Sequence, residues 1–123
     1  MKKLYMLFSS LVVVFALVSV SFGAENEESA KSWQEQATST RAQVMSVYEE
    51  LQKMGDKDNA TVKDLIADAV KQLGEGDKFL EEGDKAMEAQ QWEKANYGYN
   101  MAWQYYVKAA TAGLNAKSIL SGQ

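Results

Sequence analysis

The side chains that could do chemistry in this chain are carboxylates, lysines, tyrosines and hydroxyls, because the sequence contains no histidine and no cysteine. This composition removes the usual nucleophile–base pairs, imidazole and thiolate metal ligands, and haem attachment sequences. Glu49–Glu50 and Glu81–Glu82 are adjacent acidic pairs, but neighbours on a helix do not face a common substrate. A solvated charged face explains both pairs. We therefore expect no catalytic residue and no enzymatic activity.

One acidic segment invites comparison with a calcium site. Residues 56–59 read Asp-Lys-Asp-Asn, whereas an EF-hand loop continues with an oxygen ligand, a glycine and, at its twelfth position, a glutamate. Those three positions hold Ala60, Thr61 and Ala67. The segment is better explained as a capped turn, so the sequence predicts no metal site and no cofactor.

Aromatic residues are concentrated between Trp92 and Tyr106, where six occur in fifteen residues. At about 100° per residue, four of them share one face of a helix: Trp92, Tyr99, Trp103 and Tyr106. Such a face is typical of a buried core. The alternative is a pocket in which these rings stack on a planar or cationic ligand.

A second set, Tyr97, Met101 and Tyr105, lies on roughly the opposite side of the same helix. A three-helix bundle has nothing to cover it, and three such residues in successive turns form a contiguous strip. Tyrosine and methionine are also favoured at interfaces. The strip therefore predicts a surface that binds another protein or a second copy of the chain. Two alternatives are tyrosines that merely tolerate exposure, and a fourth helix that covers them.

The elements that position these residues are long helices, because apolar residues recur every three and four positions and the chain has no proline. The spacing predicts helices over about 29–54, 60–89 and 92–118, with a turn at Gln90–Gln91. Ser29 or Ser32 is expected to cap the first, and Asp58 or Asn59 the second. The first two helices carry heptad-like seams: Ala30, Trp33, Ala37, Thr40, Val44, Val47, Leu51 and Met54, then Val62, Ile66, Ala69, Leu73, Gly76, Leu80, Gly83 and Met87.

The predicted fold is thus an all-α, up-down-up bundle of three long helices. Glycine costs about 1 kcal/mol relative to alanine inside a helix, so the alternative is four helices with a break near Gly74–Asp77. Gly76 and Gly83 begin two similar heptapeptides, 76–82 and 83–89, and both lie on the seam. They predict a close helix approach that suits Trp92, Trp103 or Trp33; the simpler explanation is a short duplication that left two tolerated glycines.

The first residues read as a secretory signal rather than as part of the fold. Lys2 and Lys3 precede an apolar run over 4–20, and small residues follow at 21–24. We expect a signal peptide at 1–24, cut best after Gly23, and a helical bundle domain at 25–123. An uncleaved anchor is the alternative. The predicted location is exported, periplasmic or otherwise extracytoplasmic, with no stable membrane contact after cleavage.

The exported part is acidic. Without Lys2 and Lys3 it carries 11 basic and 17 acidic side chains, a net charge of −6. A domain that lacks a basic run is a poor nucleic-acid binder, since that affinity comes mainly from neutralising phosphates. We therefore expect no nucleic-acid partner.

Residues 79–106 carry a partial resemblance to the tetratricopeptide repeat. A glycine in one helix is followed, in the next, by an alanine, an aromatic and an alanine after an initial tryptophan: Gly83, Trp92, Ala95, Tyr99 and Ala102. The match is a single copy, has Glu82 where the repeat has leucine, and lacks the closing proline. It implies a similar helical hairpin. More distantly, a signal peptide before a cysteine-free bundle resembles the small exported proteins that promote tubule assembly of nitrite oxidoreductase. Together these patterns predict a non-enzymatic scaffold, assembly factor or accessory subunit, with a periplasmic small-ligand binder as the alternative.

Overall fold

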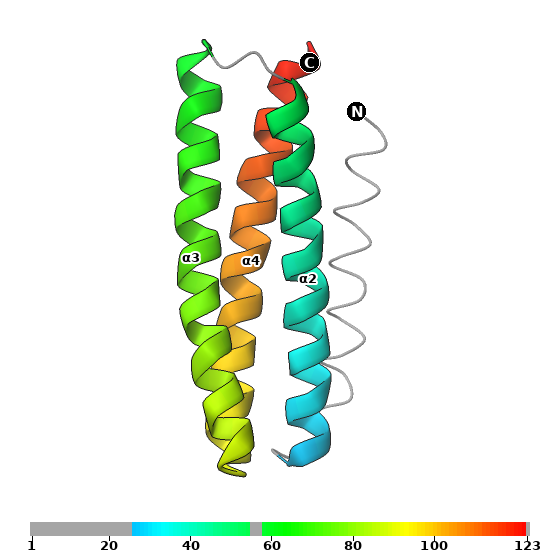
Figure 1. Cartoon of the computed structure of the whole chain (residues 1–123), viewed down its shortest axis with the longest axis vertical. Helices are drawn as coiled ribbons and strands as arrows, with labels where there is room; N and C mark the ends of the chain where they lie inside the picture. Colours follow the sequence, from blue (N-terminus) through cyan, green and yellow to red (C-terminus); the bar gives the residue numbers. More distant parts are fainter. Residues whose placement is uncertain (1–25, 55–57, 123) are drawn as a thin grey trace.

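The computed structural model describes residues 26–54 and 58–122, and within them the chain forms three long α-helices and no strand (Figure 1). Helix α2 spans Glu27–Met54, α3 spans Ala60–Glu88 and α4 spans Trp92–Leu120. This confirms the predicted all-α bundle of three long helices. None of these helices is long and apolar enough to cross a bilayer. The predicted signal peptide, residues 1–24, lies outside the described residues.

The first two helices begin at asparagine caps. The side chain of Asn26 accepts a hydrogen bond from the N–H of Ser29 at 2.9 Å, and the Ser29 hydroxyl accepts one from the N–H of Asn26 at 3.0 Å. This reciprocal pair starts α2 before Ser29, so the prediction of Ser29 or Ser32 as the cap was wrong. The side chain of Asn59 accepts a hydrogen bond from Val62 N–H at 3.1 Å, which confirms one of the two caps predicted for the next helix.

The last helix ends later than expected. Helix α4 continues through Leu120, two residues beyond the predicted end at residue 118. Leu120 packs against a core cluster that contains Val47, Leu51 and Val62. Burial of this last apolar side chain therefore holds the final turn in place.

A tight turn joins α3 and α4 at the predicted Gln90–Gln91. Gln90 adopts a φ of 59°, in the left-handed region that reverses the chain after a helix. The N–H of Gln91 donates to Ala86 O at 2.9 Å and the N–H of Gln90 to Met87 O at 3.0 Å. These bonds satisfy the last carbonyls of α3.

Helix α3 is continuous through Gly74 and Gly76, so the four-helix alternative was wrong. Gly76 is buried, and a Cβ built on it would lie 2.6 Å from the ring of Tyr106. The glycine therefore leaves the space that the Tyr106 ring of α4 fills. The burial of the opposing ring offsets the helix propensity that is lost at this position.

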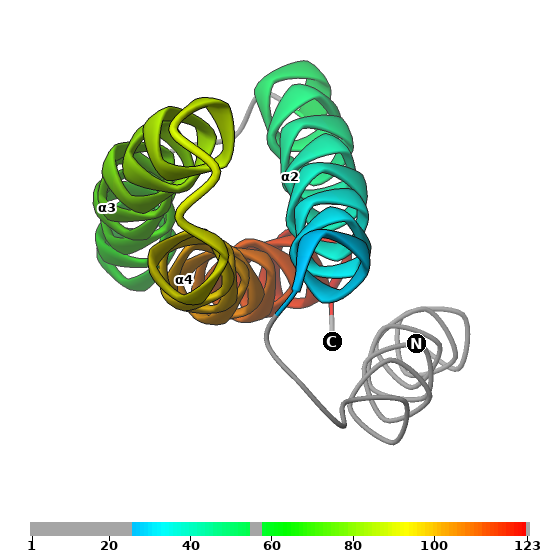
Figure 2. The same cartoon turned by 90° about the horizontal axis from the view of Figure 1, so that it is seen from below.

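Helix α4 is the centre of the bundle. It packs along both α3 and α2, whereas α2 and α3 touch each other far less. Figure 2 shows this arrangement from below, with α2 and α3 each beside α4 and apart from one another. The predicted seam of α2 is buried except for half-buried Met54, and the predicted seam of α3 alternates buried and half-buried residues. The core therefore consists of two helix–helix contacts that share α4.

Candidate functional site

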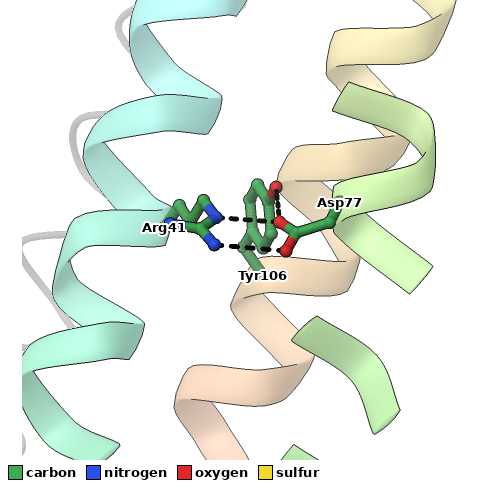
Figure 3. Close-up of polar contacts among 3 residues, drawn as sticks. All are labelled: Arg41, Asp77 and Tyr106. Atoms are coloured by element: carbon green, nitrogen blue, oxygen red, sulfur yellow. Dashed lines mark hydrogen bonds and ion pairs between the residues drawn. The ribbon is translucent and has the colours of Figure 1, made fainter. Parts of the chain in front are cut away.

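A polar layer crosses the middle of the bundle and involves all three helices (Figure 3). The phenol of Tyr106 on α4 donates to Asp77 Oδ1 on α3 at 2.5 Å. Arg41 on α2 donates to both oxygens of the same carboxylate, from Nε to Oδ1 at 2.8 Å and from Nη2 to Oδ2 at 3.2 Å. The layer ties α2 to α3 across a cleft in which these helices make few other contacts.

A second layer repeats the first one seven residues along each helix. The phenol of Tyr99 donates to Asp84 Oδ1 at 2.5 Å. From α2, Gln34 Nε2 donates to Asp84 Oδ1 at 3.2 Å and to the Tyr99 hydroxyl at 3.1 Å. Gln34 takes the place that Arg41 has in the other layer, so this carboxylate receives a neutral donor in place of a guanidinium.

Each tyrosine ring lies against a glycine of α3. A Cβ on Gly83 would lie 2.7 Å from the ring of Tyr99, and one on Gly76 would lie 2.6 Å from the ring of Tyr106. The two glycines therefore serve the close helix approach that the repeated heptapeptides suggested. Their partners are tyrosines, however, and the prediction of Trp92, Trp103 or Trp33 was wrong.

The surroundings in the two layers shift the pKa values of three groups. Burial, followed by the hydrogen bond to an aspartate and its charge, raises the pKa of both Tyr99 and Tyr106. Burial would raise the pKa of Asp77, but hydrogen bonds from Arg41 and Tyr106 and the guanidinium charge outweigh it and lower that pKa. Both phenols are thus neutral and Asp77 is ionised near neutral pH. The geometry supports a role in fixing the register of the three helices rather than a role in proton transfer.

The four aromatics of the predicted ligand pocket lie in the core. Tyr99 and Tyr106 have no exposed surface. Trp92 and Trp103 are half-buried and pack against the same clusters, with Trp103 edge-on to Trp33 at 6.1 Å between ring centroids. The structure therefore brings the predicted face together by packing its rings on neighbouring helices.

The predicted partner-binding residues lie along the outside of the α3–α4 hairpin. Tyr97 is 62% exposed, and Met101 and Tyr105 are half-buried. The expectation that nothing covers them was wrong in part, because Phe79 of α3 joins them. Its ring stacks on Tyr105 at 5.6 Å and meets Tyr97 edge-on at 6.2 Å. We call Phe79, Tyr97, Met101 and Tyr105 the outer strip.

Sequence reasoning missed Phe79 as a member of this surface. The α3 seam passes through the next residue, Leu80, and a residue one position from a seam is displaced by about 100° around the helix. That displacement places Phe79 at the edge of the α3–α4 contact. The available signal was an aromatic residue next to the seam, within the first of the two heptapeptides that begin with glycine.

Charged residues surround the outer strip. Lys94 lies about one turn before Tyr97, and Lys108 lies about one turn after Tyr105, with its Nζ 4.9 Å from the Tyr105 ring centroid. Beside Tyr97 is a shallow hollow lined by charges of both signs, among them Glu82, Lys85, Glu93 and Lys94. Across the described residues, no group of three or more carboxylates is placed to hold a metal ion.

Comparison of the chain with protein-family models, curated proteins and solved structures gives no significant match. The resemblances to the tetratricopeptide hairpin and to the tubule-assembly protein therefore stay predictions.

Proposed function

We propose that this chain is an exported, non-enzymatic helical protein that mediates protein–protein association as a scaffold, assembly factor or accessory subunit. The observation that carries the proposal is the outer strip, whose most exposed residue, Tyr97, is 62% exposed. An aromatic ring held in place by a neighbouring ring loses little side-chain freedom when a partner binds. The partner is another protein or a second copy of this chain.

The surroundings of the outer strip have the character of an interface. Protein interfaces combine an apolar, aromatic centre with a polar rim. Here the aromatic centre is flanked by Lys94 and Lys108 and by the mixed-charge hollow beside Tyr97. A partner helix laid along α3 and α4 would bury the rings and leave these charges at its edges.

The exposed part of Tyr97 is large enough to matter. A tyrosine side chain buries about 150–250 Å² in a core, so an exposed fraction of 62% leaves on the order of 100 Å². At about 25 cal/mol per Å², covering it contributes about 2–3 kcal/mol before the costs of association are subtracted. Loss of that contact would weaken binding by roughly 30- to 150-fold.

Substitution of Tyr97 by Glu tests the proposal. Tyr97→Glu places a charge at the most exposed residue of the outer strip without touching the buried layers. It removes only the edge contact with Phe79, whereas Tyr105→Glu removes the stack on that ring. Thr111→Glu is the matched control, because Thr111 is exposed on α4 and outside the outer strip. Circular dichroism should show equal helicity for both variants.

Two measurements separate the partners. Sedimentation velocity of the purified protein detects a second copy, and affinity isolation from the native host detects a different protein. We expect the oligomer, or one stoichiometric partner, with the unaltered chain and with Thr111→Glu, and its loss with Tyr97→Glu. If neither association depends on Tyr97, the outer strip has no role in binding.

The alternative of a ligand pocket walled by Trp92, Tyr99, Trp103 and Tyr106 is less well supported. Two of these rings are fully buried and their hydroxyls are already bonded to Asp84 and Asp77. Export is tested separately by the mass of the protein isolated from its host. We expect a chain that begins at Ala24 or Glu25, and the full-length mass would show that the signal is retained.

A further inference from the structure

The cleft between α2 and α3 contains a cavity where the series of tyrosines along α4 stops. Tyr99 and Tyr106 are seven residues apart, and each ring fills the space between α2 and α3 in its own layer. Seven residues beyond Tyr106 the chain has Gly113. Gly113 is one of the residues that line a cavity of about 160 Å³ walled by all three helices. A Cβ on Gly113 would lie 3.0 Å from Val47 Cγ1, so Val47 covers the glycine itself and the cavity lies beside it, in the third layer of the cleft.

The walls of the cavity differ chemically from the two polar layers. Counting seven residues along each helix, Val70 stands where the layers have Asp77 and Asp84, and Tyr48 stands where they have Arg41 and Gln34. Both residues line the cavity, together with Val47, Leu51 and Leu73. Apart from the phenol of Tyr48, every side chain around it is apolar. No carboxylate or guanidinium is present to bind a charged ligand.

We propose that this cavity binds a small, uncharged molecule that carries one apolar ring. The neighbouring layers show that the cleft accepts a six-membered ring between α2 and α3. The volume of about 160 Å³ is also close to that of an engineered apolar cavity, about 150 Å³, that binds benzene in another protein. Among the lining residues the only polar side-chain group is the phenol of Tyr48, and Val70 stands where the other layers have a carboxylate. A hydrocarbon ring is therefore favoured over a phenol, whose hydroxyl would exchange its hydrogen bonds with water for this one neutral partner.

A ligand can reach the cavity from the open side of the cleft. Val70 is 47% exposed and lines the cavity, so it lies at the mouth. Helices α2 and α3 make few contacts with each other, so little packing between them has to be broken on entry. The cavity shares no lining residue with the outer strip, so this inference is independent of the proposed association.

Toluene is the probe, followed by the methyl NMR signals of labelled valine and leucine residues in the purified protein. We expect saturable shifts of the Leu51, Val70 and Leu73 methyls, with a Kd of about 1 mM or tighter, as befits a ligand of this size. Val70→Phe places a ring in the mouth and should weaken binding at least about tenfold. Ala67→Phe adds the same ring at an exposed position of α3 that does not line the cavity, and binding should stay within about twofold.

A change of preference provides the second test. Val70→Asp introduces a carboxylate at the position where the other layers have one. The affinity for p-cresol, the side chain of tyrosine, divided by the affinity for toluene should therefore rise at least about tenfold relative to the unaltered protein. This variant keeps the cavity open and serves if Val70→Phe fails to fold. Absence of saturable shifts with toluene would overturn the proposal. Equal binding by Val70→Phe, or an unchanged preference in folded Val70→Asp, would also overturn it.

Discussion

The closest approach of two helices in the bundle predicts a sharp difference between glycines. Gly98 of α4 packs on Gly83 of α3, and a Cβ built on Gly98 would lie 2.8 Å from both Cα and N of Gly83 and 3.0 Å from Phe79 O. All three atoms belong to the backbone of α3. A methyl group at Gly98 can therefore be accommodated only if the helices separate, by about 0.6 Å to reach the 3.4 Å at which ordinary contact begins.

Gly74 is the matched control on α3. A Cβ there would meet nothing within 4 Å, so Gly74→Ala should stabilise the fold by about 1 kcal/mol through helix propensity alone. Gly98→Ala has the same gain from propensity. Separating α3 from α4 also loosens the contacts of Tyr99 and Tyr106, so the cost should lie at the upper end of the range for overpacking, about 3 kcal/mol. The net loss should be about 2 kcal/mol, and the two variants should differ by about 3 kcal/mol.

Urea denaturation followed by circular dichroism measures the difference directly, because the chain has no disulfide to complicate unfolding. Thermal midpoints should rise by about 4–8 °C for Gly74→Ala and fall by about 8–16 °C for Gly98→Ala, given the size of the domain. The slope of the free energy of unfolding against urea should stay the same in both. A Gly98→Ala variant as stable as Gly74→Ala would refute the close approach of α3 and α4.

The polar layers give three further predictions. Asp77→Asn should lower the free energy of unfolding in urea by about 1.5–3 kcal/mol, as expected for a hydrogen bond to a charged group. Asp84→Asn should lower it less, because its α2 partner is the neutral Gln34. Equal losses would show that Arg41 adds nothing to stability. The lowered pKa of Asp77 means that its contribution is present above the ordinary carboxyl value of 3.8 and is lost as the pH falls through the lower folded value, so Asp77→Asn should flatten the acid limb of stability against pH. The pKa values of Tyr99 and Tyr106 are raised in the folded state, so their contribution to stability is complete below pH 10.0 and falls as the pH rises further. A variant with both replaced by Phe should lose less stability above pH 10.0. An unchanged loss of stability in that range would contradict the burial of the phenols.

The sequence predicted the helices because their signals are local. Apolar spacing by three and four residues, the absence of proline, and Asn59 before Val62 all act within a few residues. The start of α2 was missed because Asn26, Ser29 and Ser32 are all capable caps. The structure selects Asn26, which places Glu27 and Glu28 in the first turn, where the helix dipole favours negative charge.

The partners across the helices could not be predicted in the same way. Periodicity fixes which face of a helix is buried, but it leaves open which residue of the next helix lies opposite. A tryptophan was expected to pack on Gly83. Tyr99 packs there instead, and its hydroxyl donates a hydrogen bond to the carboxylate of Asp84, which an indole ring does not have the hydroxyl to do. The available signal was the common offset of seven residues in Gln34 and Arg41, in Asp77 and Asp84, and in the two tyrosines.

That shared offset also explains how a heptad pattern specifies one register. Apolar seams alone allow two helices to slide by seven residues with little change in burial. A slide of α4 by seven residues in one direction would place Tyr99 against Gln90, beyond the end of α3. A slide in the other direction would place Tyr106 against Ala69 and Val70, where a Cβ lies under the ring and the hydroxyl has no acceptor. Only the observed register gives both tyrosines a glycine and a carboxylate. Buried polar groups of this kind stabilise a fold less by their own energy than by the alternatives that they exclude.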